Sequence, residues 1–300
     1  MAIGIIGGSG LYEIEGMENL RERSVETPFG KPSADFVCGE LNGHEVVFLS
    51  RHGKGHTVMP SEINHRANIA GLKILGVERI ISVSAVGSFR EEIAPQDVVL
   101  VDQFVDRTKQ SDEHTFFGDG IVAHIAFGNP TCHELRDLTA QAANEVVATK
   151  PASHGSRSPM VYPSGTYLNM EGPAFSTKAE SFLYKSWGMD VIGMTNLAEA
   201  KLAREAEICY CTMAMVTDYD CWHEEHDAVS VEMVVEVLKK NAATAKEVIG
   251  EVVPRISVER SCECAEALKN AVITDSAAFP EQTRDKLSFL LQKYEKEESY

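Results

Sequence analysis

Short runs of apolar residues recur along the chain, each bounded by glycine or polar residues. Runs of this length that are rich in valine and isoleucine predict buried strands. The longest carries no charge between Ile208 and Val216, which is typical of a strand covered on both faces. On this basis strands are predicted over residues 3–6, 45–50, 79–84, 97–101, 190–194 and 208–216.

Other segments place apolar residues at helical spacing. Gly76 closes the first of these segments, and Ser230 is suited to the N-cap of the last, where an apolar stripe indicates core packing. Alternating strands and helices predict a layered α/β domain. Helices are predicted over residues 61–75, 197–207 and 230–253.

The remaining segments differ in character. Residues 106–128 and 152–164 lack a clear period and predict long loops, of the kind that form lids or subunit contacts. The tail beyond Pro254 contains an amphipathic stretch from Thr283 to Tyr294. We therefore expect one domain over residues 1–256 and a C-terminal helical extension over residues 257–300, packed on or near that domain.

Composition narrows the range of functions that the protein can have. The hydrophobic content of 44% and the charged content of 24% are ordinary globular values. A net charge of −17 argues against nucleic acid and anionic membranes as partners. The chain begins without signal-peptide features and has no apolar run near the roughly 18 residues that span a bilayer. Seven scattered cysteines, an odd number, suit a reducing compartment, so we expect a cytoplasmic protein.

Two carboxylates, Asp218 and Asp220, directly follow the longest apolar run. Side chains alternate along an extended chain, so both should point to the same face. In a half-buried site their repulsion raises at least one pKa and creates a proton donor near neutral pH. Capping of the following turn is the competing interpretation, because aspartate is a good N-cap residue.

Four other predicted strands end in groups that suit an anion. The first runs into a glycine-rich turn containing Ser9, which is neither a GxGxxG nor a P-loop motif. Arg51 and His52 follow the second strand, Ser84 ends the third, and Thr195 precedes a predicted helix. Each of these features, taken alone, also has an ordinary structural interpretation as a tight turn, a basic surface loop or a plain N-cap. Because open α/β sheets bind ligands at the carboxyl ends of their strands, the convergence predicts one anion-binding site.

Two motifs resemble metal sites without matching them. The histidines of His223-Glu224-Glu225-His226 are three residues apart, whereas HExxH needs four, so we interpret this segment as an exposed polar turn. Cys262-x-Cys264 lacks the spacing and the partner pair of a structural zinc site. We interpret it as two free thiols, while a strained redox-active disulfide, or a pairing with another cysteine, stays open. No metal site is predicted.

Taken together, residues 3 to about 256 resemble the 5′-methylthioadenosine phosphorylases, in the trimeric branch of the purine nucleoside phosphorylase superfamily. The order and spacing of the motifs make the resemblance specific. It implies the nucleoside phosphorylase fold, a single α/β domain with a central mixed, partly barrel-like β-sheet flanked by helices. The motifs are GIIGGSGLY, SRHGKGHTVMPSEINHRANI, SAVGSFREEI, VDQFVDRT, MEGPAFST, AESF, MTNLAEAKLAREAEICY and MVTDYDCW.

The resemblance also implies the reaction of a pentosyltransferase in methionine and purine salvage. Phosphate attacks C1′ of methylthioadenosine, and adenine and 5-methylthioribose 1-phosphate leave, with no metal or organic cofactor. Ser84 stands where many relatives have threonine, and the hydroxyl is kept. The residues that the family pattern assigns to phosphate are Ser9, Arg51, His52, Ser84, the Ala85 backbone and Thr195.

For the nucleoside, the family pattern implies that Met194 meets the ribose and that Phe175 packs against the purine. Asp218 would protonate N7, and Asp220 would accept a hydrogen bond from the 6-amino group. His124 matches a position that a neighbouring subunit offers to the methylthio end. The implied assembly is therefore a trimer or a dimer of trimers, with sites at subunit contacts.

Three alternatives remain at this stage. A 6-oxopurine nucleoside phosphorylase would act on methylthioinosine, inosine or guanosine. However, a carboxylate acceptor suits the 6-amino donor of adenine, and a 6-oxo group suits an asparagine. A nucleoside-binding or regulatory protein without turnover is disfavoured by the joint presence of Arg51, His52, Asp218 and Asp220. A hydrolytic nucleosidase would have no use for the anion site.

Overall fold

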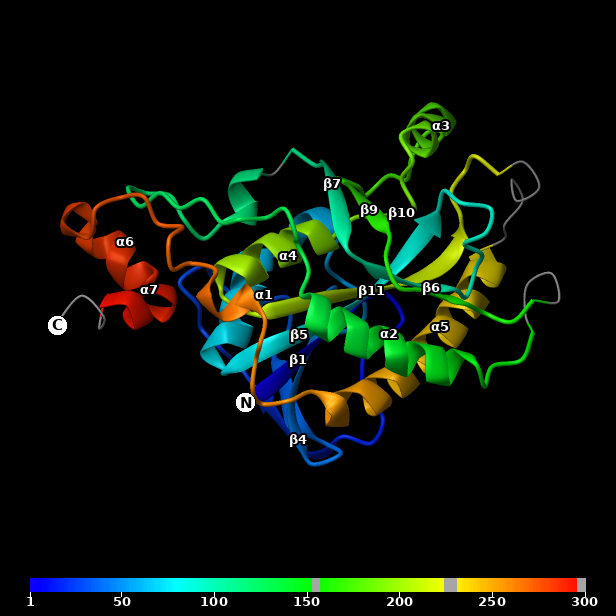
Figure 1. Cartoon of the computed structure of the whole chain (residues 1–300), viewed down its shortest axis with the longest axis horizontal. Coiled ribbons are helices and arrows are strands. Elements are labelled where there is room, and N and C mark those ends of the chain that lie inside the picture. Colours follow the sequence, from blue (N-terminus) through cyan, green and yellow to red (C-terminus); the bar gives the residue numbers. More distant parts are fainter. Residues whose placement is uncertain (110, 153–156, 224–230, 296–300) are drawn as a thin grey trace.

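A branched, mixed β-sheet forms the centre of the computed structural model, which describes residues 1–109, 111–152, 157–223 and 231–295 (Figure 1). Eleven strands belong to this sheet in the described part of the chain. They are β1 (Ala2–Gly7), β2 (Glu18–Arg23), β3 (Phe36–Leu41), β4 (His44–Ser50), β5 (Val77–Ser88), β6 (Val98–Val101), β7 (Gln103–Arg107), β8 (Val161–Tyr162), β9 (Thr166–Met170), β10 (Val191–Gly193) and β11 (Cys209–Tyr219).

The described residues contain seven α-helices (Figure 1). They are α1 (His65–Ile74), α2 (His133–Val147), α3 (Lys178–Ser186), α4 (Asn196–Glu205), α5 (Val231–Val252), α6 (Glu281–Lys286) and α7 (Ser288–Glu295). Helices α1, α2, α4 and α5 lie against the sheet, whereas α3, α6 and α7 lie further out (Figure 1). Among the described residues, no helix combines the length and the apolar character needed to cross a bilayer.

The sheet branches at β5. One path runs β2-β3-β4-β1-β5-β10-β9-β7, and a second leaves β5 through β11 and β6 to β8. The pairs of β1 with β4, of β1 with β5 and of β5 with β11 are parallel, whereas β10 lies antiparallel to β5. The predicted α/β domain built on a mixed sheet is therefore confirmed.

Two apolar layers cover the two faces of the sheet. On one face Ile3 and Ile5 of β1 pack with buried residues of α2 and α5, such as Leu135 and Val248. On the other face, buried residues of β1 and β4 pack with α1 and α4. Because helices cover both faces, ligands reach the sheet only at the ends of its strands.

Several elements differ from the predicted ones. The first predicted helix begins later, at His65, because residues Pro60–Glu62 form a 3₁₀ turn and the Asn64 side chain accepts from the Ala67 N–H at 3.0 Å. The third predicted strand continues to Ser88, since β5 extends beyond β1 to pair with β10. Prediction missed β2, whose six residues are all exposed, and also β3, β7, β8, β9, α2 and α3.

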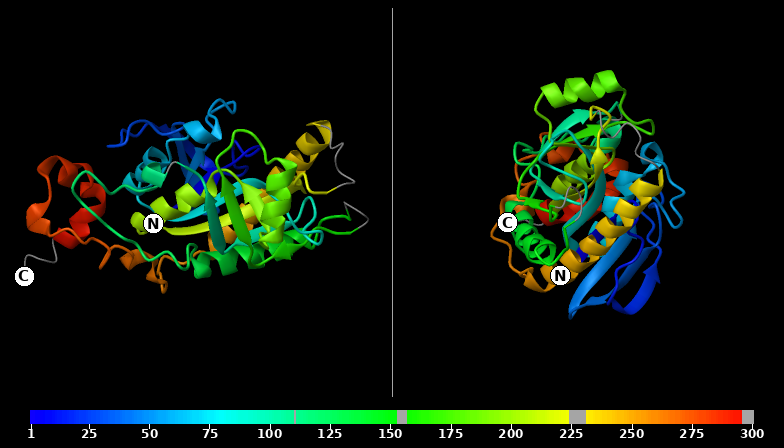
Figure 2. Two further views of the ribbon diagram at one scale, coloured as in Figure 1. Left: turned by 90° about the horizontal axis from the view of Figure 1, so that it is seen from above. Right: turned by 90° about the vertical axis from the view of Figure 1, so that its right-hand side faces the viewer.

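The tail forms α6 and α7, which overlap the predicted amphipathic stretch and extend slightly beyond both of its ends, and it projects from one end of the molecule (Figure 2). Leu287, Leu290 and Leu291 join the apolar layer that contains α1 and α4. The Phe289 ring lies 5.6 Å from that of Phe116. The predicted Ser230 cap and the Glu224-Glu225-His226 part of the polar turn lie outside the described residues.

Candidate active site

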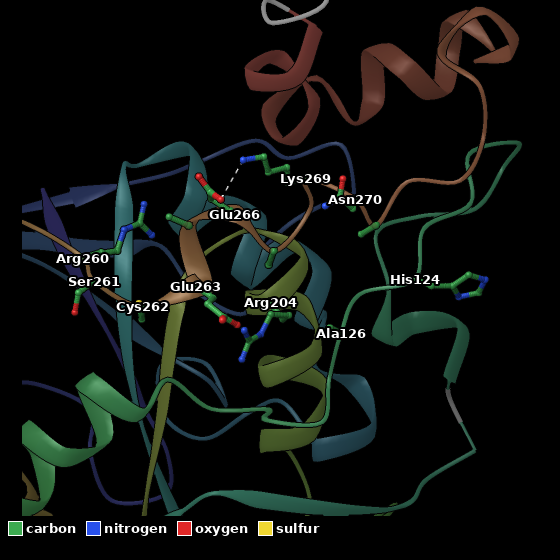
Figure 3. Close-up of a pocket in the computed structure, with 13 residues that line it drawn as sticks. His124, Ala126, Arg204, Arg260, Ser261, Cys262, Glu263, Glu266, Lys269 and Asn270 are labelled. Atoms are coloured by element: carbon green, nitrogen blue, oxygen red, sulfur yellow. Dashed lines mark hydrogen bonds and ion pairs between the residues drawn. The ribbon is translucent and has the colours of Figure 1, made fainter.

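A cavity of about 340 Å³ lies where β1, β4, β10 and β11 end, beside the second half of β5. Ten of the eleven predicted site residues line it: Ser9, Arg51, His52, Ser84, Ala85, Phe175, Met194, Thr195, Asp218 and Asp220. The eleventh, His124, lines a separate cavity of about 670 Å³ next to the C-terminal segment (Figure 3). The fold thus brings together every predicted group but one within a single chain.

The glycine turn after β1 is required by close packing. A Cβ atom at Gly8 would lie 2.5 Å from the Val83 carbonyl oxygen and 2.8 Å from Nη1 of Arg51. Side-chain atoms do not fit at these distances, so the backbone itself forms this wall of the cavity. The Leu11 N–H donates to the Gly8 carbonyl at 3.1 Å and closes the turn around Ser9.

Arg51 is held by a partner that the sequence did not reveal. Its side chain and that of Glu199 are each 1% exposed and form an ion pair through Arg51 Nε. Arg51 Nη1 also donates to the Val83 carbonyl at 3.1 Å, and Nη2 to Ser82 Oγ at 2.5 Å. Burial opposes both charges, but the Arg51 guanidinium still lowers the pKa of Glu199 below its ordinary value. Arg51 therefore reaches the cavity as a fixed, partly neutralised cation.

Glu199 belongs to a wider buried network beneath the cavity. Its Oε2 accepts from Ser82 Oγ at 2.6 Å and from the Tyr210 hydroxyl at 2.8 Å. Asn196 Nδ2 donates to Ser82 Oγ at 2.9 Å and to the Tyr210 hydroxyl at 2.7 Å. In the sequence, Glu199 is merely an acid in the first turn of a helix, where acids are common. No sequence signal separates this role from the ordinary one.

His52 is a neutral ring with a defined tautomer. Burial, reinforced by the Arg51 charge, lowers its pKa to about 4. Its Nδ1 lies 3.0 Å from the Val58 carbonyl, which can only accept, so the proton is on Nδ1. Nε2 then carries a lone pair and accepts. A neutral His52 can therefore accept a hydrogen bond through Nε2 but cannot donate one from that atom.

Hydroxyl groups line the opposite side of the cavity. Ser84 Oγ lies 3.4 Å from the Tyr167 hydroxyl. Thr195 is the N-cap residue of α4, yet its side chain makes no capping hydrogen bond to any described residue. Its hydroxyl donates instead to Asn196 Oδ1 at 3.3 Å. Thr195 lines the cavity at the N-terminus of α4, whose partial positive charge favours an anion.

The acid pair follows a β-bulge. Val216 pairs with Val86 and Asp218 pairs with Gly87, so Thr217 is an extra residue in β11. Such a bulge redirects the strand, and Asp218 and Asp220 both line the cavity. Burial, with a smaller contribution from Asp220, raises the pKa of Asp218 to about 6. The pair is therefore not an exposed cap, because one member is a weak acid placed inside a cavity.

Asp220 differs from its neighbour in its hydrogen bonding. Its Oδ2 atom is buried and has no hydrogen-bond partner among the described residues. Burial also raises its pKa. Thr217 Oγ1, in contrast, donates a hydrogen bond to Asp218 Oδ1. Hydrogen bonds from Ser181, the Cys221 backbone and Ser176 offset part of the rise in the pKa of Asp220.

Apolar groups complete the wall. Ile192, Met170 and Leu238 join Met194 and Phe175 around the cavity. Phe175 follows the Gly172–Pro173 cis peptide bond and is 84% exposed. An aromatic ring at this position offers a flat surface at the mouth of the site.

The profile of the phosphorylase superfamily matches residues 2–254. The S-methyl-5′-thioadenosine phosphorylase of Geobacter sulfurreducens is 56% identical over 292 residues, which cover 97% of this chain and 98% of that protein. The enzyme of the same name from Synechocystis is 55% identical, covering 97% of this chain and 87% of that protein.

Solved structures agree with these matches. A crystal structure of methylthioadenosine phosphorylase from an antarctic soil metagenomic library has a TM-score of 0.89 at 46% identity, covering 96% of this chain and 98% of that one. Methylthioadenosine phosphorylase from Schistosoma mansoni in complex with adenine has a TM-score of 0.81 at 39% identity, covering 89% and 96%. The chain therefore belongs to the S-methyl-5′-thioadenosine phosphorylase family of the phosphorylase superfamily, which confirms the predicted family.

Proposed function

We propose that the chain catalyses the phosphorolysis of 5′-methylthioadenosine to adenine and 5-methylthioribose 1-phosphate, and that it does so in the cytoplasm. The observation that carries this proposal is the presence of a weak acid, Asp218, in the same cavity as an oxyanion site. The likeness to a Schistosoma mansoni enzyme solved with methylthioadenosine supports the choice of substrate. Phosphate is a co-substrate, and no metal or organic cofactor takes part in the reaction.

Phosphate binds between the glycine turn and the N-terminus of α4. Arg51 supplies a positive charge, and Ser9, Ser84, Thr195 and the Ala85 backbone contribute hydrogen-bond donors. Neutral His52 accepts a hydrogen bond from the hydroxyl group that phosphate carries near neutral pH. Since Glu199 holds the guanidinium rigidly, the site needs little reorganisation when the anion arrives.

The nucleoside lies across the second half of the cavity. Met194 contacts the ribose, and Phe175 covers the purine at the mouth. Asp220, which lines the cavity, accepts a hydrogen bond from the 6-amino group. A 6-oxopurine would instead place a lone pair against this carboxylate, which disfavours inosine and guanosine.

The reaction exchanges one bond at C1′ for another. A phosphate oxygen forms the new bond to C1′ as the C1′–N9 bond breaks, and the bond electrons move into the purine. Asp218 gives its proton to N7, so adenine leaves as a neutral base. Bound phosphate offsets the positive charge that develops on the ribose.

A nucleoside panel assayed with and without phosphate tests the function. We expect adenine release from methylthioadenosine that requires phosphate and yields a sugar phosphate. Methylthioinosine and inosine should react at least about 100-fold more slowly, because each leaves the buried carboxylate without a donor. A preference for hypoxanthine release would instead show that the protein is a 6-oxopurine nucleoside phosphorylase. Turnover without phosphate would make it a hydrolase.

We also propose that the protein assembles as a trimer or a dimer of trimers, in which His124 meets the methylthio end of a nucleoside bound to a neighbour. His124 is remote from the cavity of its own chain. On and beside α3, Phe182, Leu183 and Trp187 are 52%, 44% and 47% exposed, which suits a subunit contact.

Light scattering after size-exclusion chromatography should give a mass of three or six chains. His124→Ala should raise the KM for methylthioadenosine by about tenfold and leave the KM for phosphate unchanged, because only the sugar end loses a contact. A fully active monomer would contradict this arrangement. Equal KM values for methylthioadenosine in the parent and in His124→Ala would contradict it as well.

A further inference from the structure

Four cysteine thiols from three separate segments converge near the start of β11. Cys132 is the N-cap residue of α2, Cys209 begins β11, and Cys262 and Cys264 lie in the C-terminal segment. Their Sγ atoms all lie within 4.8 Å of one another. We propose that these four thiols form a structural site for one zinc ion.

The spacing of the sulfur atoms suits a tetrahedron. Zinc bound by four thiolates at about 2.3 Å requires sulfur atoms about 3.8 Å apart. The Sγ atoms of Cys209 and Cys262 are 3.4 Å apart, and small side-chain rotations close the wider separations. A disulfide would join sulfurs two at a time at about 2.05 Å, whereas all seven cysteines, each in the described residues, are free thiols.

Cys262 and Cys264 are free thiols, as predicted, and the proposed zinc site gives them a role that the motif alone does not indicate. The sequence offers no nearby partner pair, which argued against zinc. The fold supplies that pair from Cys132 and Cys209, which are distant in the sequence. A local spacing rule does not detect ligands that come from a helix start and a strand start.

Hydrogen bonds fix the backbone on both sides of the cluster. The Cys132 N–H donates to the Tyr210 carbonyl at 2.8 Å, which ties the start of α2 to β11. Arg79, which is 4% exposed, donates through Nη2 to the carbonyls of Ser257 at 2.9 Å and Glu259 at 3.1 Å. The C-terminal segment is thus anchored just before its two cysteines, and the ligands are held in place before a metal binds.

The charges around the four thiols and the access to them from solvent both suit a bound zinc ion. Binding releases the four thiol protons to water and leaves a complex with two net negative charges. Arg136 and Arg204 line a cavity of about 490 Å³ with Cys132, Cys262 and Cys264, so cations lie beside this anionic complex and a metal has an entry route. Cys262 also borders the larger cavity beside Arg204 (Figure 3).

The position of the site indicates a structural role. Cys209 begins β11, and Asp218 lies nine residues further along it, which corresponds to about 30 Å of extended strand. Zinc there would join the C-terminal segment to α2 and β11, and would take no part in the proposed phosphorolysis. Its loss should therefore lower the unfolding temperature and leave turnover at low temperature unchanged.

The test uses the full-length chain without a polyhistidine tag, produced with zinc in the medium and purified with a reductant. Elemental analysis after dialysis should give about one zinc ion per chain. Protein reconstituted with Co²⁺ should show the intense thiolate-to-cobalt absorption of a tetrahedral site. Neither measurement depends on turnover, so a failed proposed function would leave this test intact.

Cys262→Ser should lower the bound zinc at least about tenfold, because a ligand and its negative charge are lost. Cys38→Ser is the matched control, since Cys38 and Cys262 are both 9% exposed, and it should keep the metal. If Cys262→Ser fails to fold, the zinc content and the cobalt spectrum of the unaltered chain still test the proposed zinc site. An unaltered chain that holds no zinc, or a mass that reveals a disulfide among these four cysteines, would overturn the proposal.

Discussion

Asp218→Asn should lower kcat by about 10²- to 10⁴-fold while leaving phosphate binding nearly unchanged. The amide keeps the size of the side chain and can still accept from Thr217, but it has no proton to give to N7. The loss should fall on kcat and on kcat/KM together, because the proton transfer occurs only in the transition state. Phosphate affinity measured by calorimetry separates this outcome from a collapsed site. Unchanged turnover would remove Asp218 from the role of the acid.

The same substitution should stabilise the protein near pH 8. The pKa of Asp218 is about 6 in the folded chain, compared with an ordinary aspartate pKa of 3.8, so the folded state binds more protons between these values. Stability therefore falls as the pH rises through this window, and above it the buried charge is fully present. Asparagine avoids that cost, which amounts to at most about 3 kcal/mol.

Chemical denaturation at several pH values measures this effect. Asp218→Asn should be more stable than the parent at about pH 8. This difference in stability should disappear at about pH 4, where side chain 218 is neutral in both folded proteins. Asp285→Asn, which alters an exposed aspartate on α6, should change neither stability nor kcat. A variant that is less stable than the parent at high pH would show that Asp218 is not a buried, destabilised acid.

Sequence reasoning located the site better than it located the elements. Ser9, Arg51 and Asp218 follow apolar runs that form β1, β4 and β11, and parallel strands bring such positions to one edge whatever their exact order. In contrast, β2 was missed because all its residues are exposed and no alternation marks it. Local patterns therefore predict positions at strand ends, and they fail for strands that only pairing defines.

What the sequence could not show are the contacts between distant segments. Glu199 has an ordinary appearance at a helix start, yet it is the partner of Arg51. The bulge at Thr217 depends on how β11 pairs with β5, and the sequence of either strand alone does not determine this pairing. The four-cysteine cluster has the same origin, because its ligands meet only after α2, β11 and the C-terminal segment have packed.

Glu199→Gln should destabilise the protein by about 3 to 5 kcal/mol, because it leaves the buried Arg51 charge without its counter-ion. The amide also loses one of the acceptor atoms that serve Ser82 and Tyr210. Glu247→Gln is the matched control: it breaks the exposed pair with Lys150, and it should cost less than about 1 kcal/mol. Urea denaturation of the two variants measures both values.

Phosphate and a second substitution distinguish the charge from simple loss of packing. An unpaired Arg51 should bind phosphate more strongly, so phosphate should raise the unfolding temperature of Glu199→Gln by more than that of the parent. Adding Arg51→Gln to Glu199→Gln removes the uncompensated charge and should restore part of the lost stability. If the double variant is less stable than Glu199→Gln alone, and phosphate stabilises all forms equally, the pair acts through packing and does not tune the charge of the phosphate site.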